Sequence, residues 1–218
     1  GVTRLKGGEI EGGDIEIPGD ISSSSFLLTL AILLPGSRLN IDGVGLNQTR
    51  TGILDIIAKM GGKISTTVTA QDPDWKEPIG EISTRFSPLV GITISAELTM
   101  RAIDEIPLVA LLATQAEGQT IISNASILRY KETDRLQTIA SELHKMGANI
   151  RESTDGLIIE GPTPLKGARV ESHEDHRIAM MLVVAGMVAE GTTEIDSINS
   201  IRYSFPTFLD SLKSMGAR

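Results

Sequence analysis

The chain has 218 residues, 40% of them hydrophobic and 22% charged, which predicts a globular protein with its core in one large domain or two small ones. Its 20 Lys and Arg residues against 28 Asp and Glu residues give a net charge of -8, which argues against a surface for nucleic acid or an anionic membrane. Because Cys is absent, disulfides, thiolate nucleophiles and zinc sites with Cys ligands are excluded. An anionic ligand would need a local concentration of basic side chains.

Two patterns bear on the location of the protein. The longest apolar stretch, residues 178–188, is too short to span a bilayer. No signal-peptide pattern opens the chain. We therefore expect a cytoplasmic protein.

A pattern of helix, glycine turn, strand and second helix occurs three times along the chain. An apolar run typical of a helix leads to a glycine turn at Gly36, Gly118 and Gly191, and a strand-like stretch follows each turn. An amphipathic segment comes next and ends at Met-Gly, where glycine suits the C-terminus of a helix. The three stops are IAKMGGKI (57–64), LHKMGANI (143–150) and LKSMGAR (212–218). Reuse of a common helix stop is the alternative, but the matching order of elements favours a genuine triplication.

Two segments depart from this regular order. The chain continues into a strand after the first two stops, whereas the third copy ends at Arg218, so one strand is missing or supplied elsewhere. Residues 69–81 carry Pro, Asp and the only Trp, which predicts a long exposed loop or hairpin crossover between the first two units.

A polar cluster precedes each apolar helix: GDISSSS (19–25), DEIP (104–107) and HEDHR (173–177). Asp, Ser and Pro are the residue types that start helices, and capping alone explains the first cluster. The other two carry more charge than a cap requires. A pseudo-threefold arrangement would bring the three N-termini to one end of the domain, where free backbone N–H groups attract phosphate or carboxylate.

The segment RYKETDRL (129–136) is expected to begin the second helix of the middle copy. Lys131 and Arg135 would then stand one turn apart, a like-charge pair that costs a helix about 0.2 to 0.5 kcal/mol. Glu132 could offset that cost by contacting Arg135 in a solvated charge ladder. We favour an anion-binding site, in which Lys supplies a point charge, Arg a planar fork, and Glu132 a proton.

The HEDHR cluster admits three interpretations. His173, Glu174, Asp175 and His176 offer ligands for a metal, although only one other His, His144, exists in the chain and a catalytic zinc site wants three protein ligands. A purely capping role is the second interpretation. We favour the third, in which His176 and Arg177 form a second cationic pair directed at the same anion.

Six segments occur in the order typical of one family: GDISSSSFLL, GLNQTRTGILDIIAKMG, IDEIPLVALLATQAEG, RYKETDRL, EDHRIAM and SFPTF. From about Ile15 onward the chain resembles the C-terminal half of the family of 5-enolpyruvylshikimate-3-phosphate synthase (EPSP synthase, 3-phosphoshikimate 1-carboxyvinyltransferase). The resemblance implies an α/β (α+β) domain made of a pseudo-threefold repeat of βαβαββ units, the third incomplete. In that family the N-terminal residues of the protein cross over to complete this domain.

The resemblance also implies boundaries and partners. Residues 1–14 would be an interdomain linker or leading strand, and 15–218 the C-terminal domain, with units at about 15–68, 90–160 and 168–218. The partners would be shikimate 3-phosphate, phosphoenolpyruvate and the N-terminal domain of the same enzyme, with no nucleic acid, membrane, cofactor or metal. We expect the chain to be inactive by itself, since the family binds its substrates between the two domains.

Site residues follow from the resemblance position by position. Asp104 corresponds to the contact of the shikimate 5-hydroxyl and a candidate base for its proton, and Lys131 to a neighbouring contact. Glu132 corresponds to the acid that protonates the methylene carbon of phosphoenolpyruvate. The positions of Arg135, His176 and Arg177 correspond to ligands of its carboxylate and phosphate.

Some positions leave alternatives open. Tyr203, beside Arg202, stands where some members have Lys, and Ile127 where some have Asn. Arg50 and Thr51 fit the family segment either as support for a turn or as ligand contacts. Two other functions remain: an enolpyruvyl transferase acting on UDP-N-acetylglucosamine, and a non-catalytic α/β repeat module for protein interaction, with its charge clusters serving as caps.

Overall fold

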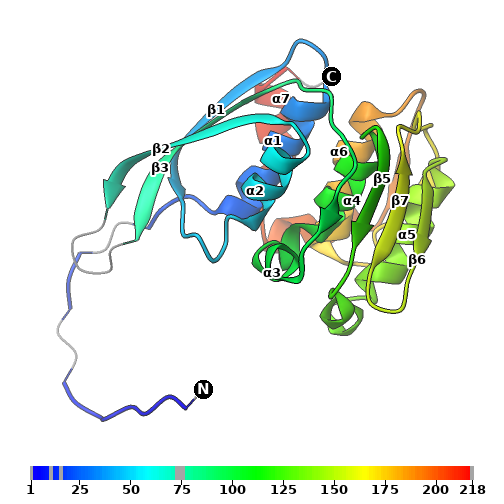
Figure 1. The fold of residues 1–218 in the computed structure, drawn as a ribbon. Coiled ribbons are helices and arrows are strands. Elements are labelled where there is room, and N and C mark those ends of the chain that lie inside the picture. Colours follow the sequence, from blue (N-terminus) through cyan, green and yellow to red (C-terminus); the bar gives the residue numbers. More distant parts are fainter. Residues whose placement is uncertain (1, 10–11, 15–16, 72–76, 217–218) are drawn as a thin grey trace.

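The computed structural model describes residues 2–9, 12–14, 17–71 and 77–216. These residues form an α/β fold with three small sheets and a helical interior (Figure 1). Residues 2–9 and 12–14, expected as a linker or leading strand, are largely exposed and belong to no helix or strand. Among the described residues, no helix is both long enough and apolar enough to cross a membrane.

The first sheet has the strand order β1-β3-β2, with both pairs antiparallel. Its elements are α1 (Ile21–Leu33), β1 (Arg38–Gly45), α2 (Gly52–Lys59), β2 (Lys63–Gln71) and β3 (Pro78–Arg85). Gly19, just before α1, forms a parallel bridge to Val44 of β1. The sequence thus supplies a short leading extended segment, a helix, and then the strand that pairs with it.

The segment predicted as a loop or crossover between the first two units lies within the first sheet. Residues 69–71 and 78–81 belong to β2 and β3, two antiparallel neighbours that form a hairpin, and residues 72–76 lie outside the described residues. The hairpin alternative is therefore confirmed, and the hairpin lies within the first sheet. The sheet also extends past residue 68, where the first unit was expected to end, because β3 inserts between β1 and β2.

The second sheet repeats the pairing of the first, with the strand order β4-β5-β7-β6. The β4–β5 pair is parallel, and the β5–β7 and β7–β6 pairs are antiparallel. Its elements are β4 (Thr93–Ile94), α3 (Ala96–Arg101), the 3₁₀ helix η1 (Ile103–Glu105), α4 (Ile106–Thr114), β5 (Gly118–Ile122), the 3₁₀ helix η2 (Ser126–Tyr130), α5 (Arg135–Lys145), β6 (Asn149–Glu152) and β7 (Leu157–Gly161).

The third sheet consists of the parallel pair β8–β9. Its elements are β8 (Arg169–Glu171), α6 (His176–Val188), β9 (Glu194–Asp196), the 3₁₀ helix η3 (Ile198–Tyr203) and α7 (Phe208–Ser214). Within the part of the chain that the structure describes, nothing corresponds here to the antiparallel strands that follow α2 and α5.

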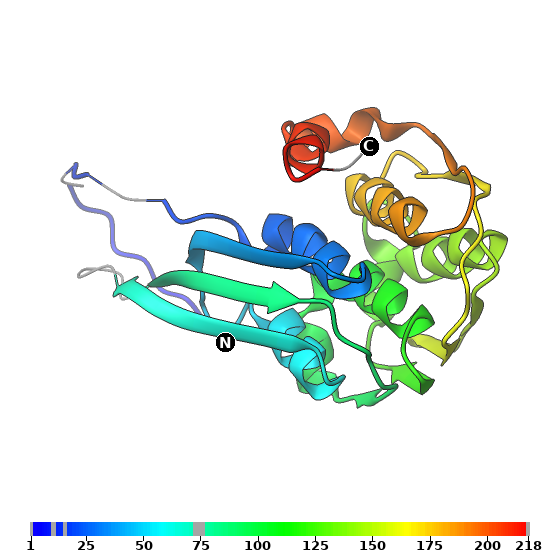
Figure 2. The ribbon, with the colours of Figure 1, turned by 90° about the horizontal axis from the view of Figure 1, so that it is seen from above.

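The first helix of each copy lies in the interior, where α1, α4 and α6 contact one another (Figure 2). Their apolar residues are spread over all faces, as expected for helices surrounded by protein. Leu28, Leu108 and Val184, one from each helix, are almost fully buried. Phe208 of α7 is also buried and packs edge-on against Phe26 of α1, with 5.8 Å between ring centroids.

Glycines end the helices at equivalent places in the three copies. Gly36, Gly118 and Gly191 have φ of 82°, 90° and 93°, and each lies just before or at the start of the strand that follows an interior helix. The Met-Gly stops behave alike, since Gly61, Gly147 and Gly216 have φ of 88°, 93° and 99°. Glycine is favoured there because a Cβ strains a left-handed backbone. The predicted turns and helix stops are confirmed.

Candidate active site

The N-termini of the three interior helices meet at one end of the fold. Ser22 in the first turn of α1 donates its hydroxyl hydrogen to Glu105, the residue before α4. Arg177 at the start of α6 reaches the same carboxylate, with 3.7 Å between Nη1 and Oε1. The expected convergence of helix starts is therefore present, and it brings polar clusters more than 80 residues apart into direct contact.

Two of the three helices begin with an aspartate cap. The side chain of Asp20 accepts hydrogen bonds from the backbone N–H groups of Ser22 and Ser23, at 3.2 and 2.8 Å, which confirms Asp20 as a cap. Capping alone does not explain the first cluster, because the Ser22 hydroxyl bonds Glu105. Asp175 caps α6 through the N–H groups of Arg177 and Ile178, at 2.9 and 3.4 Å. Capping therefore explains Asp175 but not the other charged side chains of HEDHR.

The prediction that RYKETDRL begins a helix is wrong at its start. The helix α5 begins at Arg135, because Asp134 caps it by accepting the N–H of Gln137 at 3.1 Å. Residues 131–134 form a loop, which Arg129 holds through 2.9 Å contacts to Asp134 and Glu152. The like-charge pair of Lys131 and Arg135 one helical turn apart consequently does not form.

The side chain of Arg135 is buried and holds two carboxylates. It is 1% exposed, and it forms a two-point ion pair with the fully buried Asp175, with Nε to Oδ2 at 2.7 Å and Nη2 to Oδ1 at 3.2 Å. Its Nη2 also lies 2.6 Å from Oε2 of Glu132. Arg135 thus links the start of α5, the start of α6 and the loop that carries Glu132.

Three cations surround the carboxylate of Asp104. The nitrogen atoms of Lys131, Arg177 and Arg135 lie 3.4, 3.5 and 3.7 Å from its oxygens. Partial burial raises the pKa of Asp104, but the attraction of Arg177, Lys131 and Arg135 outweighs it, so the pKa lies below its ordinary value. Asp104 is therefore an ionised carboxylate that can accept a hydrogen bond or a proton.

The neighbouring carboxylate, Glu105, was not predicted as a site residue. It is 2% exposed, accepts a hydrogen bond from Ser22, and burial raises its pKa above the ordinary value. Arg50 in turn donates from Nη2 to the Ser22 hydroxyl oxygen at 3.1 Å. One feature of the sequence could have indicated Glu105: it is the second acid of DEIP and directly precedes an apolar helix.

His176 and Glu132 face each other at the edge of the site. Their Nδ1 and Oε1 atoms are 3.9 Å apart, and the His176 side chain is 22% exposed. Burial and the nearby Arg177 lower the pKa of His176 below its ordinary value of 6.5, against the opposing effect of Asp175 and Glu132. His176 is therefore neutral at pH 7 and can donate or accept a hydrogen bond.

We predict that this shift makes stability depend on pH. A folded chain that binds the proton less tightly than the unfolded chain has its full stability above pH 6.5 and loses part of it as the pH falls below that value. Urea unfolding of the wild type between pH 5 and 8 measures this loss. His176→Gln should reduce it, whereas His144→Gln, at an exposed position of α5, should leave it unchanged.

The remaining predicted positions are nearby or exposed. The Arg202 guanidinium lies over the Tyr203 ring, 5.0 Å from its centroid, and Ile127 is 49% exposed. His173 lies 3.2 Å from the buried carboxylate of Glu142 on α5. Among the described residues, no group of three or more His, Asp and Glu side chains is arranged to hold a metal.

The structure brings together all six predicted residues: Asp104, Lys131, Glu132, Arg135, His176 and Arg177. Each of the three permanent cations lies against a carboxylate, so an anion must compete with these partners. A cavity of about 40 Å³ lies between the starts of α1 and α6, lined in part by Ser22, His176 and Arg177. The candidate site is thus a charged surface with a small cavity at its edge.

Comparison with known proteins shows which family the chain belongs to. The sequence model of the family described as EPSP synthase (3-phosphoshikimate 1-carboxyvinyltransferase) matches residues 2–212. The chain belongs to the EPSP synthase family. Relatives named 3-phosphoshikimate 1-carboxyvinyltransferase include one from Geobacter sulfurreducens, 47% identical over 100% of this chain and 50% of its own length. Another, from Oceanobacillus iheyensis, is 46% identical over 95% of this chain and 48% of its own.

Solved structures agree with this family. An EPSP synthase from Acinetobacter baumannii superposes with a TM-score of 0.90 and 36% identity, over 97% of this chain and 49% of that one. The enolpyruvyl transferase NikO from Streptomyces tendae, at 22% identity, shares the fold with a TM-score of 0.75, over 94% of this chain and 44% of that one. The chain spans about half the length of the curated EPSP synthase relatives it matches.

Proposed function

We propose that this chain forms one half of a 3-phosphoshikimate 1-carboxyvinyltransferase, which transfers the enolpyruvyl group of phosphoenolpyruvate to the 5-hydroxyl of shikimate 3-phosphate and releases phosphate. The observation that carries the proposal is the meeting of Asp104 from η1, Glu132 from the loop before α5 and Arg177 from the start of α6 in a chain of this family. Helix capping would require neither the acids nor the cations in that arrangement.

The chemistry of the transfer assigns a role to each carboxylate. Glu132 protonates the methylene carbon of phosphoenolpyruvate while the shikimate oxygen attacks the neighbouring carbon, and Asp104 accepts the hydroxyl proton. The tetrahedral intermediate then expels phosphate, and a proton leaves the new methyl group to restore the double bond. Glu132 suits this exchange because its side chain is 47% exposed and lies between Arg135 and His176. Asp104 is ionised and exposed enough to accept the hydroxyl proton, although the cations that lower its pKa make it a weaker base than an ordinary Asp.

The cations would hold the anionic groups of both substrates. Lys131 and Arg177 retain exposed surface, at 34% and 16%, so they can exchange a carboxylate partner for a ligand oxygen. Arg135 is buried, and a ligand would reach it only by displacing Glu132 from its 2.6 Å contact. We infer that Arg135 acts mainly by fixing Glu132 and Asp175, and that ligands first meet Lys131, His176 and Arg177. Fixed cations of this kind stabilise the charge that develops in the transfer.

The finer organisation of the fold belongs to the same proposal. Equivalent glycines, equivalent interior helices and the matching order of the first two sheets support three βαβαββ units about a pseudo-threefold axis. The unit boundaries consistent with the sheets are about 17–85, 90–161 and 166–216. In the family, residues from the other half of the protein complete the third unit, and we assign the same completion to this chain.

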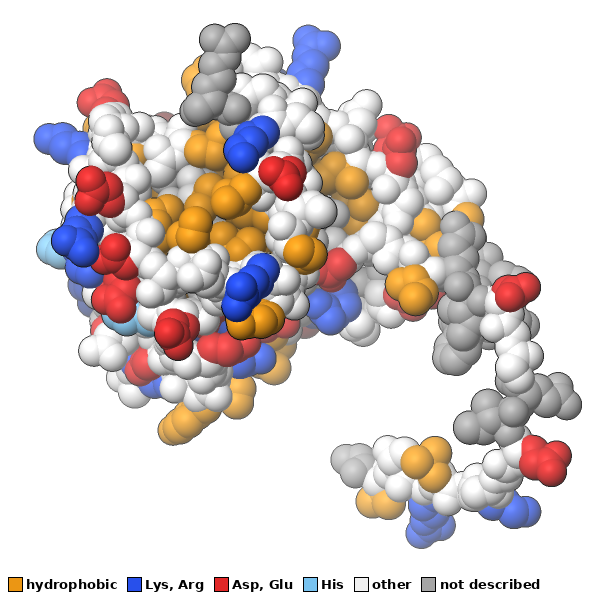
Figure 3. Space-filling model, turned by 180° about the vertical axis from the view of Figure 1, so that it is seen from behind, with side chains coloured by type: hydrophobic (Ala, Val, Ile, Leu, Met, Phe, Trp, Pro, Cys, Tyr) orange, Lys and Arg blue, Asp and Glu red, His pale blue; other side chains and the backbone are white. Residues whose placement is uncertain are grey.

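An apolar groove supports that assignment. A cavity of about 470 Å³ lies between α1, β1, α6 and α7, and most of its lining is apolar, including Leu30, Met187 and Leu212. Apolar side chains also gather in a hollow on the face seen in Figure 3. Strands supplied by the absent half would continue the short β8–β9 sheet and cover apolar surface of this kind.

The test is a chimaera in which this chain replaces the matching half of the Geobacter sulfurreducens relative. We predict that the folded chimaera releases phosphate from phosphoenolpyruvate and shikimate 3-phosphate, whereas the chain alone shows no measurable release. Turnover by the chain alone would show that the site does not need a second half. A folded but inactive chimaera would reject the proposed function.

Two controls separate the alternatives. Release of phosphate with UDP-N-acetylglucosamine in place of shikimate 3-phosphate would identify a different enolpyruvyl transferase. A titration of the isotope-labelled chain with both substrates, followed by NMR against a sulfate control, tests the non-catalytic alternative. Saturable shifts at Asp104, Lys131 and His176 support a half-site, and their absence in every arm, together with an inactive chimaera, supports a module without catalytic function.

A further inference from the structure

The outer face of the first sheet carries three cations in one row. Arg85 of the central strand β3 pairs directly with Arg38 of β1 on one side and with Lys63 of β2 on the other. Residues that face each other across antiparallel strands point to the same side of the sheet. The next row along, Leu39, Thr84 and Ile64, therefore points inward, and it is buried or half-buried.

This row is electrostatically unfavourable by itself. Like charges directly opposite each other destabilise a sheet, and all three side chains are exposed. Among the ion pairs of the described residues, none involves Arg38, Lys63 or Arg85, in contrast to the cations of the candidate active site. In a chain of net charge -8, three adjacent cations without a carboxylate partner require a reason.

Helix dipoles account for only part of the row. Arg38 and Lys63 follow shortly after the C-termini of α1 and α2, where the dipole favours a cation. Arg85 ends the central strand β3 and follows no helix. The helix dipole therefore does not explain Arg85, which lies between Arg38 and Lys63 in the row.

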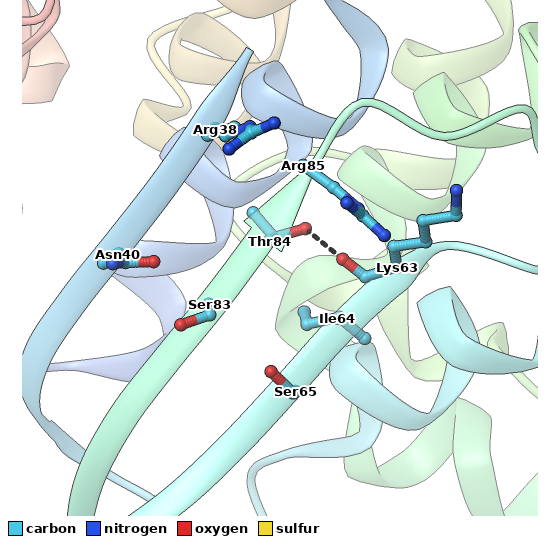
Figure 4. Close-up of a pocket in the computed structure, with 8 residues that line it drawn as sticks. All are labelled: Arg38, Asn40, Lys63, Ile64, Ser65, Ser83, Thr84 and Arg85. Atoms are coloured by element: carbon cyan, nitrogen blue, oxygen red, sulfur yellow. Dashed lines mark hydrogen bonds between the residues drawn. The ribbon is translucent and has the colours of Figure 1, made fainter.

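The surroundings of the row form a shallow basin. A cavity of about 380 Å³ is lined by the three cations, by the second outward row, Asn40, Ser83 and Ser65, and by Ile64 and Thr84 between the two rows (Figure 4). Figure 4 shows Arg85 extending from the middle strand toward the side chain of Lys63. The Thr84 hydroxyl donates to the backbone oxygen of Lys63 at 3.0 Å, which fixes β2 against β3 beneath the cations. Two hydroxyls and an amide thus lie beside three positive charges.

We propose that this basin, formed by Arg38, Lys63, Arg85, Asn40, Ser65 and Ser83, binds a chain of phosphoryl groups, as found in inorganic polyphosphate or in the triphosphate of a nucleotide. Neighbouring strands are about 4.8 Å apart, so the outer cations arise from backbones about 10 Å apart. Linked phosphoryl groups can contact all three cations at once, whereas a single phosphate requires the long side chains to converge on it. The two guanidinium forks match phosphate oxygens, and Asn40 and Ser65 can donate to the oxygens that remain, while the Ser83 hydroxyl lies 3.4 Å from the carboxylate of Glu81.

The basin is separate from the candidate active site. The helix α1 begins at that site with Ser22 and ends near the start of β1, where Arg38 lies. Its 13 residues span about 20 Å at 1.5 Å per residue. The inference concerns a different ligand from that of the proposed transferase function, and the two sites share no residue, although Arg38 also lines the apolar groove at the end of α1.

The experiment is an NMR titration of the labelled chain with tripolyphosphate, with ATP and with inorganic phosphate. We expect saturable amide shifts around Arg38, Lys63 and Arg85 with the first two ligands and markedly weaker binding of phosphate. If tripolyphosphate and ATP bind equally, the phosphoryl chain alone is recognised, and tighter binding of ATP identifies a nucleotide. Shifts spread evenly over all exposed cations would overturn the proposal.

The variant Arg85→Gln should weaken tripolyphosphate binding by about tenfold, since it removes a charge-assisted contact. Arg85→Lys should retain more affinity than Gln because it keeps the charge. The matched control is Arg151→Gln, which removes the same charge from an exposed position of β6 in the second sheet. Equal affinity of the Arg85→Gln and Arg151→Gln variants, with both folded by their NMR spectra, would contradict the site.

Discussion

Replacing Asp175 by Ala is expected to lower the free energy of unfolding by about 3 to 5 kcal/mol, the usual cost of removing one partner of a buried ion pair. The carboxylate accepts two hydrogen bonds from Arg135, whose side chain is 1% exposed and would retain a buried charge with a weakened set of partners. Asp175 also caps α6, so its loss frees backbone N–H groups of that helix. Urea unfolding followed by circular dichroism measures the change.

Asp20→Ala is the matched control for this prediction. Asp20 caps α1 with the same pattern of two backbone hydrogen bonds, but it is exposed and pairs with no buried cation. Loss of a cap costs about 1 kcal/mol, so the difference between the two variants reports the contribution of the buried pair. Equal destabilisation would mean that Arg135 finds sufficient compensation in Glu132 and Asp104.

Glu132→Gln in the active chimaera is expected to lower kcat by about 10²- to 10⁴-fold, the usual contribution of a general acid or base. Glutamine keeps the size of the side chain and can still accept a hydrogen bond from Arg135, but it cannot deliver a proton to a carbon atom. The KM values for both substrates should therefore change much less than kcat. Steady-state phosphate release at several substrate concentrations separates the two effects.

Glu97→Gln serves as the control for Glu132. Its side chain is 81% exposed and lies on α3, where its nearest cation is Arg101 at 4.0 Å. The control should leave kcat unchanged. A Glu132→Gln chimaera with wild-type kcat would exclude Glu132 as the proton donor, and a rise in KM alone would assign it to binding.

The features that could be predicted from the sequence are those that depend on residues close to one another in the chain. The turns at Gly36, Gly118 and Gly191 require a left-handed backbone, for which glycine is the favoured residue. The interior helices are apolar on every face, which a helix tolerates only when protein surrounds it. Asp20 caps the helix next to it in sequence, so its role also follows from neighbouring residues.

The features that could not be predicted depend on contacts between distant segments. Arg135 is buried because Asp175, 40 residues away, meets it in the fold. Glu105 is part of the site because Ser22, 83 residues away, donates to it. The late start of α5 shows the same limit, since Arg129 holds Asp134 in place as the cap of the helix and the sequence alone does not show that contact. Family resemblance supplied the membership of the site, and the structure supplied the partners of each cation.

The short third sheet has a consequence for the behaviour of the chain in solution. Among the described residues, β9 pairs only with β8, so one edge of this sheet presents backbone groups without a neighbouring strand. Such an edge is a template for pairing with another polypeptide. We predict that the chain self-associates at high concentration by pairing of these strand edges, and that a segment pairing with β9, as proposed for the other half of the protein, would suppress this association.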